Sequence, residues 1–434
     1  MSARPRLLYV SLFYPPSRAS GVYRAKTTAD LFAESGWDVT VATADEGYFA
    51  SLAGSTDPSL VPGIDESVRV KRVSPPSSEG SVLASVRAGL GKRADRRFEA
   101  RFFPEKYWGW ARRVLEESLR EHSRRPFDLV LATGNPNSAF AVAQQFKERT
   151  GTPYLLDFRD SWTLDLFTGK EAHAEDSADG RWERRCVEGA AGISFVNEPI
   201  REWYAARYPE AADRMTVVLN GWDEEYLDTE AQAGHGEPGP HTDFAFVGTL
   251  TRQHLVKRMG AGLDALRRAN PELGARIRLY GYLGYFEDSR AGLMRKLGLD
   301  GESGGDPAVE YRGPIPKSEI SSVYARSDVL LFLAGGSKYV TSGKVFEYMA
   351  TGKPVVSIHK KGSDAERFLR DYPLWFKPES LEADDVAAAM RSAADAARSP
   401  DPDLTARALD HGVQWSRRRS LRRLVETAET CLVR

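Results

Sequence analysis

The chain lacks the residues on which small secreted or metal-stabilised folds depend. Its 434 residues include only two cysteines, Cys186 and Cys431, too few for a disulfide framework or a cysteine-rich zinc site. The apolar run at residues 7–13 is too short for a secretory signal, and no run approaches the ~18 apolar residues of a membrane-spanning helix. We therefore expect a cytoplasmic protein, with peripheral contact to the inner face of a membrane left open.

An excess of charge of one sign is also missing. Lys and Arg number 60 and Asp and Glu number 61, which gives a formal net charge of -1. A general nucleic-acid-binding protein would carry a basic excess, so we expect no nucleic-acid partner. The hydrophobic share of 41% and the charged share of 28% are those of an ordinary folded protein. At roughly 150 residues per domain, the length indicates two or three domains.

Several catalytic and metal-binding signatures are absent as well. The sequence has no Walker loop, no zinc-ligand spacing and no Gly-x-Ser-x-Gly elbow. His173, His235 and His241 lie in polar segments, and the pair Asp401 and Asp403 follows no predicted strand. We therefore expect neither a bound metal nor a cofactor.

Segments of strand and helix character alternate along the first half. Residues 6–13 are an apolar run of strand length, a helical pattern covers 24–35, and 38–42 is short and β-branched. Strand, helix and strand in under 45 residues are typical of the βαβ unit of a parallel sheet. The alternation continues through predicted strands at 128–133, 153–158, 192–196 and 216–219 and predicted helices at 138–147, 180–191 and 198–208.

A polar segment rich in Gly and Pro at 230–243 indicates a linker, after which the alternation restarts. We predict an α/β fold of two Rossmann-like parallel-sheet domains that face each other across a cleft. The predicted divisions are an N-terminal domain at 1–225, a linker at 226–242, a C-terminal domain at 243–403 and a helical segment at 404–434 that packs back on the N-terminal domain. Ligands of such sheets bind beyond the carboxyl ends of the strands.

One basic segment with aromatic neighbours has two interpretations. Residues 86–110 combine many arginines with Tyr107, Trp108 and Trp110. Such a segment could dock on an anionic membrane surface. The alternative, which we favour, is a solvated helix that packs its aromatic side chains on the N-terminal domain.

The motifs of the second half resemble the donor-binding domain of GT-B glycosyltransferases, in particular glycosyltransferase family 4. They are FVGTL at 246–250, YRG at 311–313, VYARSDV at 323–329 and SGKVFEYMATGKPVV at 342–356. The first half fits the same family through FYPPSRASGVYRA near the start, DFRDSW at 157–162 and VLNGWD at 218–223. The resemblance spans nearly the whole chain, and the block around Glu347 is its most specific part.

The resemblance implies a donor site for a nucleoside diphosphate sugar in the second half. Arg252 and Lys257 match the basic residues that stabilise the departing diphosphate, and we assign them catalytic roles. Glu347 matches the glutamate that accepts hydrogen bonds from the ribose hydroxyls. The alternative for Arg252 and Lys257 is that they are two solvent-facing cations without a ligand. The alternative for Glu347 is that its carboxylate only complements a helix dipole. The remaining predicted donor-binding residues are Gly248, Thr249, Gly343 and Lys344, of which Lys344 either neutralises phosphate or caps its loop.

The first half supplies the predicted acceptor side. Gly21 lies in the first βα loop, where a glycine permits close approach of the backbone to a ligand, and we predict that it contributes to donor binding. Asp160, at the end of a buried strand, is the third predicted catalytic residue. Its neighbour Arg159 is predicted to bind the acceptor, although a structural ion pair of Arg159 and Asp160 with each other or with Glu183 is equally open. The other predicted acceptor-binding residues are Tyr23, Arg24 and Asn135.

At one position the sequence departs from the family pattern. Family members commonly have a second glutamate eight positions before the one matched by Glu347, and here that position is Tyr339. The missing acid usually contacts the sugar, so the identity of the donor sugar is open.

The family resemblance implies a retaining, metal-independent transfer of a sugar from a nucleoside diphosphate sugar. The predicted acceptor is a saccharide, a lipid-linked saccharide or a specialised metabolite. One alternative is a nucleotide-sugar epimerase or a phosphorylase on the same architecture. Another is a non-catalytic scaffold that retains nucleotide binding.

Overall fold

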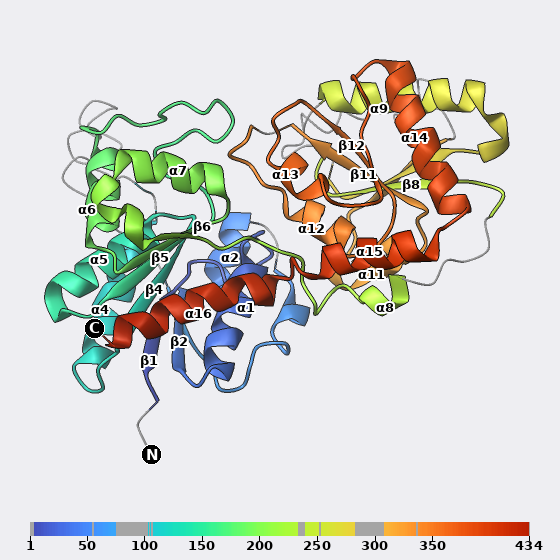
Figure 1. The fold of residues 1–434 in the computed structure, drawn as a ribbon. Coiled ribbons are helices and arrows are strands. Elements are labelled where there is room, and N and C mark those ends of the chain that lie inside the picture. The colour runs from blue at the N-terminus through green and yellow to red at the C-terminus, as the bar shows by residue number, and fades with distance from the viewer. Residues whose placement is uncertain are drawn as a thin grey trace. The chain divides into compact units, whose positions relative to one another are not determined.

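The computed structural model describes residues 4–53, 56–74, 103, 105, 107–232, 239–250, 253–282, 308–335 and 337–433. The chain forms two compact units (Figure 1). The first comprises Met1–Asn220 and Arg418–Arg434, and the second comprises Gly221–Arg417. The chain therefore passes from one unit to the other twice.

The first unit is built on a parallel sheet of seven strands in the order β3-β2-β1-β4-β5-β6-β7. β1, an interior strand, is paired in parallel on both sides, with Leu7 opposite Val39 of β2 and Leu129 of β4. The strand order reverses between β1 and β4, which is the position where ligands bind in open α/β sheets. The strands are β1 (Arg6–Val10), β2 (Asp38–Ala44), β3 (Arg69–Val73), β4 (Leu129–Gly134), β5 (Tyr154–Phe158), β6 (Gly192–Phe195) and β7 (Met215–Val217).

Helices cover this sheet, and two of them share one core with it. α1 (Val22–Glu34) and α16 (Arg417–Val433) contribute Phe32, Leu421 and Leu424 to the cluster that also holds Leu7 and Leu129. The return of the C-terminal helix to the first unit therefore buries an apolar face of α16. The other helices of the unit are α2 (Glu46–Ala53), α4 (Trp108–His122), α5 (Ser138–Thr150), α6 (Ala178–Gly189) and α7 (Glu198–Arg207).

The second unit has a parallel sheet of six strands in the order β10-β9-β8-β11-β12-β13. Its order reverses between β8 and β11. α9 (Gln253–Ala269) and α14 (Ala383–Arg398) pack against each other, and their apolar side chains join those of the strands in one core. The strands are β8 (Asp243–Val247), β9 (Arg276–Tyr280), β10 (Val309–Gly313), β11 (Val329–Ala334), β12 (Val355–His359) and β13 (Trp375–Phe376).

Five further helices complete the described part of the second unit. α12 (Gly343–Met349) follows β11, and α15 (Pro402–Val413) packs against it. Tyr348 of α12 accepts a hydrogen bond from the backbone N–H of Val247 at 3.0 Å, which ties the helix to the end of β8. The others are α8 (Thr229–Gln232), α11 (Ile320–Ala325) and α13 (Ala365–Leu369).

The prediction of two parallel-sheet α/β domains is confirmed, and α2 and β3 of the first unit were not predicted. β3 has the sequence RVKRV and forms the edge of its sheet. Its cationic residues interrupt the apolar run by which the buried strands were recognised in the sequence. The helix favoured within residues 86–110 overlaps α4 only at residues 108–110, where α4 buries Trp110; the rest of α4 was not predicted. The unit limits lie at 220 and 417, whereas the predicted limits were 225 and 403; α15 belongs to the second unit and α16 to the first.

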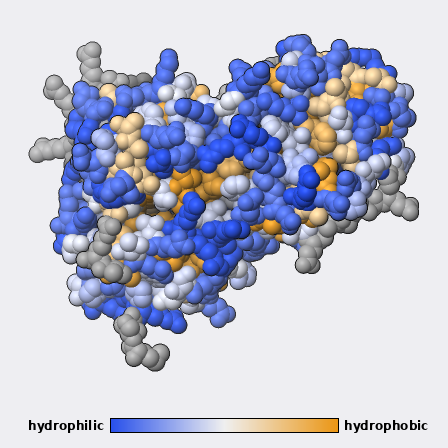
Figure 2. Space-filling model, viewed as in Figure 1, coloured by the Kyte–Doolittle hydropathy of each residue, from blue (hydrophilic) through white to orange (hydrophobic). Residues whose placement is uncertain are grey.

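The face shown in Figure 2 is largely hydrophilic, with smaller areas of apolar side chains. Within the described ranges, none of the helices has the length and apolar character needed to cross a bilayer. The segment 86–110 lies mostly outside the described residues. Its described aromatic residues pack inward: Trp110 is fully buried, and Trp108 stacks on Phe103 with ring centroids 5.6 Å apart.

Candidate active site

A buried carboxylate with three donors lies at the centre of the second unit's candidate site. Glu347 projects from α12 and is only 7% exposed. Its Oε1 accepts a hydrogen bond from Nζ of Lys317 at 2.7 Å. Its Oε2 accepts one from Nζ of Lys344 at 2.6 Å and one from the hydroxyl of Tyr324 at 2.8 Å. Sequence reasoning identified Glu347 and Lys344 but missed Lys317 and Tyr324.

The two ammonium groups control the charge of this cluster. Burial alone would raise the pKa of Glu347, but Lys317 and Lys344 outweigh it and hold that pKa well below its ordinary value. Burial lowers the pKa of Lys344, and the carboxylate only partly opposes this shift. The carboxylate is therefore ionised throughout the neutral range. With both lysines protonated, the three ionisable side chains carry one net positive charge, which suits an anionic ligand.

The other predicted donor-binding residues of the second unit lie at the start of α12 and after the end of β8. Gly343 is the first residue of α12, and Ser342 before it caps the helix through its side chain. Gly248, with φ +152°, follows β8 directly, and a side chain on the facing Gly281 would collide with the Gly248 carbonyl. Thr249 is half-buried.

The structure describes only one of the two predicted diphosphate-binding cations. Lys257 is exposed on α9. Arg252 lies outside the described residues. Their catalytic roles stay predictions, and so do the roles of the other site residues.

The loop between β11 and α12 carries the residue that departs from the family pattern. Tyr339 is half-buried, its backbone N–H donates to Oγ of Ser337 at 3.2 Å, and Nζ of Lys338 lies 5.1 Å from its ring centroid. Thr341 donates a hydrogen bond to the carboxylate of Asp364, which begins α13. The loop is therefore tied to a neighbouring helix and presents an aromatic and a cationic side chain where the family pattern has an acid.

In the first unit, Arg24 is part of a buried ion pair. Its Nε and Nη2 donate to the two carboxylate oxygens of Asp157 at 2.9 and 2.7 Å. The exposed fractions of the two side chains are 3% and 0%. Burial opposes the charge on Asp157, but the guanidinium outweighs it and lowers the pKa of Asp157. The predicted acceptor-binding role of Arg24 stays a prediction, and the structure gives this side chain a role in holding the unit together.

Three of the predicted residues meet at the ends of β1, β4 and β5. Arg159, just after β5, donates to the backbone carbonyls of Gly134 and Asn135, at 2.5 and 2.8 Å. A methyl group on Gly21 would lie 1.5 Å from Nη1 of Arg159, so only a glycine leaves room for this guanidinium. Asn135 and Asp160 are exposed. These residues lie at the point where the strand order of the first sheet reverses.

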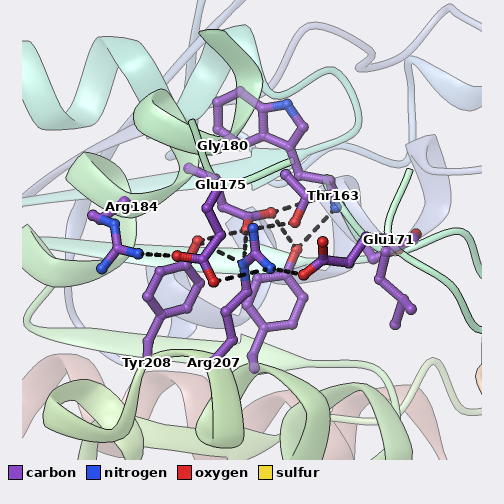
Figure 3. A network of polar contacts seen from close by, with 12 residues as sticks. Thr163, Glu171, Glu175, Gly180, Arg184, Arg207 and Tyr208 are labelled. Atoms are coloured by element: carbon purple, nitrogen blue, oxygen red, sulfur yellow. Dashed lines mark hydrogen bonds and ion pairs between the residues drawn. The ribbon is translucent and has the colours of Figure 1, made fainter. Parts of the chain in front are cut away.

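The role predicted for Tyr23 stays a prediction, and the ion pair that the sequence left open for Glu183 is not observed. Tyr23 is half-buried in the first turn of α1. The contacts of Glu183 are with Thr163, Tyr204, Tyr208 and Arg207 (Figure 3), not the ion pair with Arg159 or Asp160 that the sequence left open. Among the side chains that the structure describes, no group of three or more His, Cys, Asp or Glu residues is placed to hold a metal ion.

Two family models match the chain. Residues 22–221 match the glycosyl transferase 4-like domain, and residues 241–395 match glycosyl transferases group 1. The two matches cover most of both units. The chain therefore belongs to the family-4-like glycosyltransferases of the GT-B fold and is a glycosyltransferase. No curated protein matches it by sequence.

Solved structures share the fold at low sequence identity. A glycosyltransferase from Rickettsia africae has a TM-score of 0.67 at 12% identity, over 99% of each chain. Sucrose-phosphate synthase from Thermosynechococcus elongatus has a TM-score of 0.63 at 15% identity, over 99% of this chain and 100% of the other. HepE from Anabaena, solved in complex with UDP and glucose, has a TM-score of 0.62 at 14% identity, over 98% and 99%.

Proposed function

We propose that the chain transfers a sugar from a nucleoside diphosphate sugar to a saccharide, lipid-linked saccharide or specialised-metabolite acceptor, with retention of the anomeric configuration and without a metal ion. The observation that carries the proposal is the Glu347 cluster. A carboxylate can accept two hydrogen bonds from the cis-diol of a ribose, and ammonium groups beside it can neutralise a diphosphate. UDP, the nucleotide named for HepE, is a nucleoside diphosphate, the class of leaving group that this proposal requires.

The cluster supplies the electrostatic part of the reaction. As the glycosidic bond to the donor breaks, negative charge builds up on the leaving diphosphate. Fixed positive charges in a dehydrated site stabilise that charge without reorganising at the moment of reaction. In this proposal Lys344 joins Arg252 and Lys257 in that role, and together they take the place of a divalent cation. Retention is proposed on the resemblance to glycosyltransferase family 4.

On the acceptor side, the proposal uses the residues at the ends of β4 and β5. Arg159 and Asn135 bind acceptor hydroxyls, and Asp160 lies beside them as an exposed carboxylate. The proposed acceptor classes are a saccharide, a lipid-linked saccharide or a specialised metabolite. Positioning of the acceptor hydroxyl against the anomeric carbon supplies much of the acceleration, as in other transferases without covalent chemistry.

Calorimetry with UDP, GDP, dTDP, ADP and CMP, without and with Mg²⁺, tests the donor site. We expect one nucleoside diphosphate to bind selectively and with an affinity that Mg²⁺ leaves unchanged. Glu347→Ala should weaken that binding about 10- to 100-fold, the usual effect of losing hydrogen bonds to a charged group. Glu319→Ala, at an exposed glutamate of the neighbouring turn, is the matched control and should bind like the wild type.

Three outcomes would contradict the proposal. Failure of every nucleotide to bind the wild type would favour a scaffold without a donor site. Unchanged binding by Glu347→Ala would place the nucleotide elsewhere. Release of free sugar or a changed sugar, without transfer to an added acceptor, would favour the epimerase or phosphorylase alternative.

A further inference from the structure

The carboxylate of Glu347 already accepts three hydrogen bonds from its own unit. An ionised carboxylate offers about four lone-pair positions, two on each oxygen. Oε2 accepts from Nζ of Lys344 and from the hydroxyl of Tyr324, at 2.6 and 2.8 Å. Oε1 accepts from Nζ of Lys317 at 2.7 Å. Among the contacts of the described residues, about one position, on Oε1, remains for a ligand.

The cis-diol of a ribose needs two positions on this carboxylate. Each of its two hydroxyls donates one hydrogen bond, so binding both of them to Glu347 takes two lone pairs. Because about one is available, one of the three internal donors has to leave before the second hydroxyl binds. The geometry of the cluster therefore links recognition of the ribose to the release of a donor.

The three donors differ in how easily they can leave the carboxylate. Tyr324 is fully buried, so its hydroxyl would lose its acceptor inside the unit. The Lys317 side chain is 13% exposed, whereas the Lys344 side chain is 25% exposed and is already partly hydrated. Leaving a donor without a partner costs more the more deeply the donor is buried. The Lys344 ammonium is therefore the donor that leaves at the lowest cost.

The released ammonium needs a new anionic partner. A partly buried charge without a partner is costly, although Glu347 itself remains paired with Lys317. A nucleoside has the ribose hydroxyls but no charged group to offer. A nucleoside diphosphate carries phosphate oxygens on the same ribose, and a lysine has a flexible four-carbon chain that lets its ammonium reach a new partner. The diphosphate therefore supplies the partner that the ammonium requires.

We propose that Lys344 makes the site selective for nucleotides over nucleosides, because its ammonium moves from Glu347 to a phosphate oxygen as the ribose hydroxyls bind the carboxylate. The inference rests on the proposed function and deepens it: binding of the ribose depends on the phosphate of the same ligand. Lys317 and Tyr324 stay on the carboxylate and act as positioning residues that fix its orientation.

The test measures binding of uridine, 2′-deoxyuridine and UDP to the full chain by NMR titration, with the guanosine and adenosine series in parallel. Lys344→Met removes the ammonium and keeps the length of the side chain. We expect this variant to bind UDP about 10- to 100-fold more weakly, because a hydrogen bond between charged groups is lost. It should bind uridine about 2- to 10-fold more tightly, the effect of one added hydrogen bond, because a position on Oε2 is freed. 2′-Deoxyuridine lacks one of the two hydroxyls and should not gain.

Two further variants separate the exchange from a general effect of charge. Tyr324→Phe frees a position on Oε2 without removing a charge, so it should bind uridine more tightly and UDP no more weakly than the wild type. This variant also tests the inference if Lys344→Met does not fold. Arg268→Met removes an exposed positive charge from the last turn of α9 and should change neither affinity.

Uridine binding decides the inference. Uridine affinity that is unchanged or lower in Lys344→Met would overturn it, since Lys344 would then be only a phosphate contact. An equal gain for 2′-deoxyuridine would overturn it as well, because the gain would not come from the diol. Failure of the proposed function is seen separately: the wild type then binds none of the nucleoside diphosphates, or Glu347→Ala binds them like the wild type.

Discussion

Arg24 of α1 and Asp157 of β5 form a doubly hydrogen-bonded ion pair inside the first unit. The same carboxylate accepts hydrogen bonds from the hydroxyls of Ser194 and Thr133, at 2.7 and 3.1 Å. The remaining donors of Arg24 reach the backbone carbonyls of Leu219 and Val218. This one pair therefore joins α1, three strands of the sheet and the segment after β7.

Breaking that pair should destabilise the first unit strongly. Asp157→Asn leaves the Arg24 charge buried without its partner, and such a loss costs about 3–5 kcal/mol. We expect an earlier unfolding transition in urea, followed by tryptophan fluorescence. Asp160→Asn, three residues away and exposed, should leave the transition unchanged while reducing turnover. Equal stability of Asp157→Asn and the wild type would contradict the structural role.

The Glu347 cluster predicts a pH dependence of stability. Because the pKa of Glu347 in the folded chain is held below its ordinary value of 4.5, its stabilising contribution is fully present above about pH 5. The contribution is lost as the pH falls from the unfolded-state pKa through the folded-state pKa. The stability difference between the wild type and Glu347→Gln should therefore be constant from pH 8 to about pH 5 and narrow below it. A difference that narrows as the pH rises would reverse the sign and contradict the ion pairing.

Gly21 should matter for the placement of Arg159. The backbone of Gly21, with φ -78°, allows an alanine, but the added methyl group would displace the guanidinium that binds the Gly134 and Asn135 carbonyls. We expect Gly21→Ala to change stability by less than about 1 kcal/mol and to reduce turnover about 10- to 100-fold, the scale of a misplaced site group. In the Arg159→Ala background the same substitution should have little further effect, and full additivity would refute the coupling.

Replacing either of two glycines in the second unit by alanine should change the stability of that unit, in opposite directions for the two positions. A methyl group on Gly412 of α15 would lie 2.1 Å from the backbone carbonyl oxygen of Met349 in α12, so Gly412→Ala should destabilise the unit by about 1–3 kcal/mol. Because α12 carries Glu347, nucleotide affinity should fall as well. An added methyl group on Gly260 of α9 meets nothing within 4 Å, and Gly260→Ala should stabilise by about 0.4–1 kcal/mol. Thermal unfolding of both variants checks the contrast.

The sequence was sufficient to predict most of the strands, because buried parallel strands are short apolar runs that few other elements imitate. β1, β4 and β5 were predicted to within a few residues for this reason. β3 was missed because an edge strand is solvated on one side, and Arg69, Lys71 and Arg72 give it the composition of a loop. Most of α4 was missed because its apolar residues follow a long polar and basic segment, and the helix favoured within 86–110 reaches only its first three residues.

The candidate site could be predicted only as far as local motifs reach. Glu347 and Lys344 are three residues apart on one helix turn and are part of one sequence block. Lys317 and Tyr324 lie 30 and 23 positions before Glu347, and only the fold of the chain brings Lys317, in the turn before α11, and Tyr324 of α11 to the carboxylate on α12. The contacts of the buried Glu183 could not be predicted either. Thr163, Tyr204 and Arg207 belong to no sequence motif, and they reach Glu183 only in the folded chain.

The return of α16 to the first unit sets the order in which the two units can be completed during synthesis. The seven strands of the first sheet precede residue 220, yet Leu421, Leu424, Val425 and Ala428 belong to its core. At ~5–20 residues per second, the ribosome needs about 10–40 s to make the intervening Gly221–Arg417 unit. During this time the apolar face that α16 later covers is uncovered in the nascent first unit. The second unit is therefore fully synthesised before the first unit is complete.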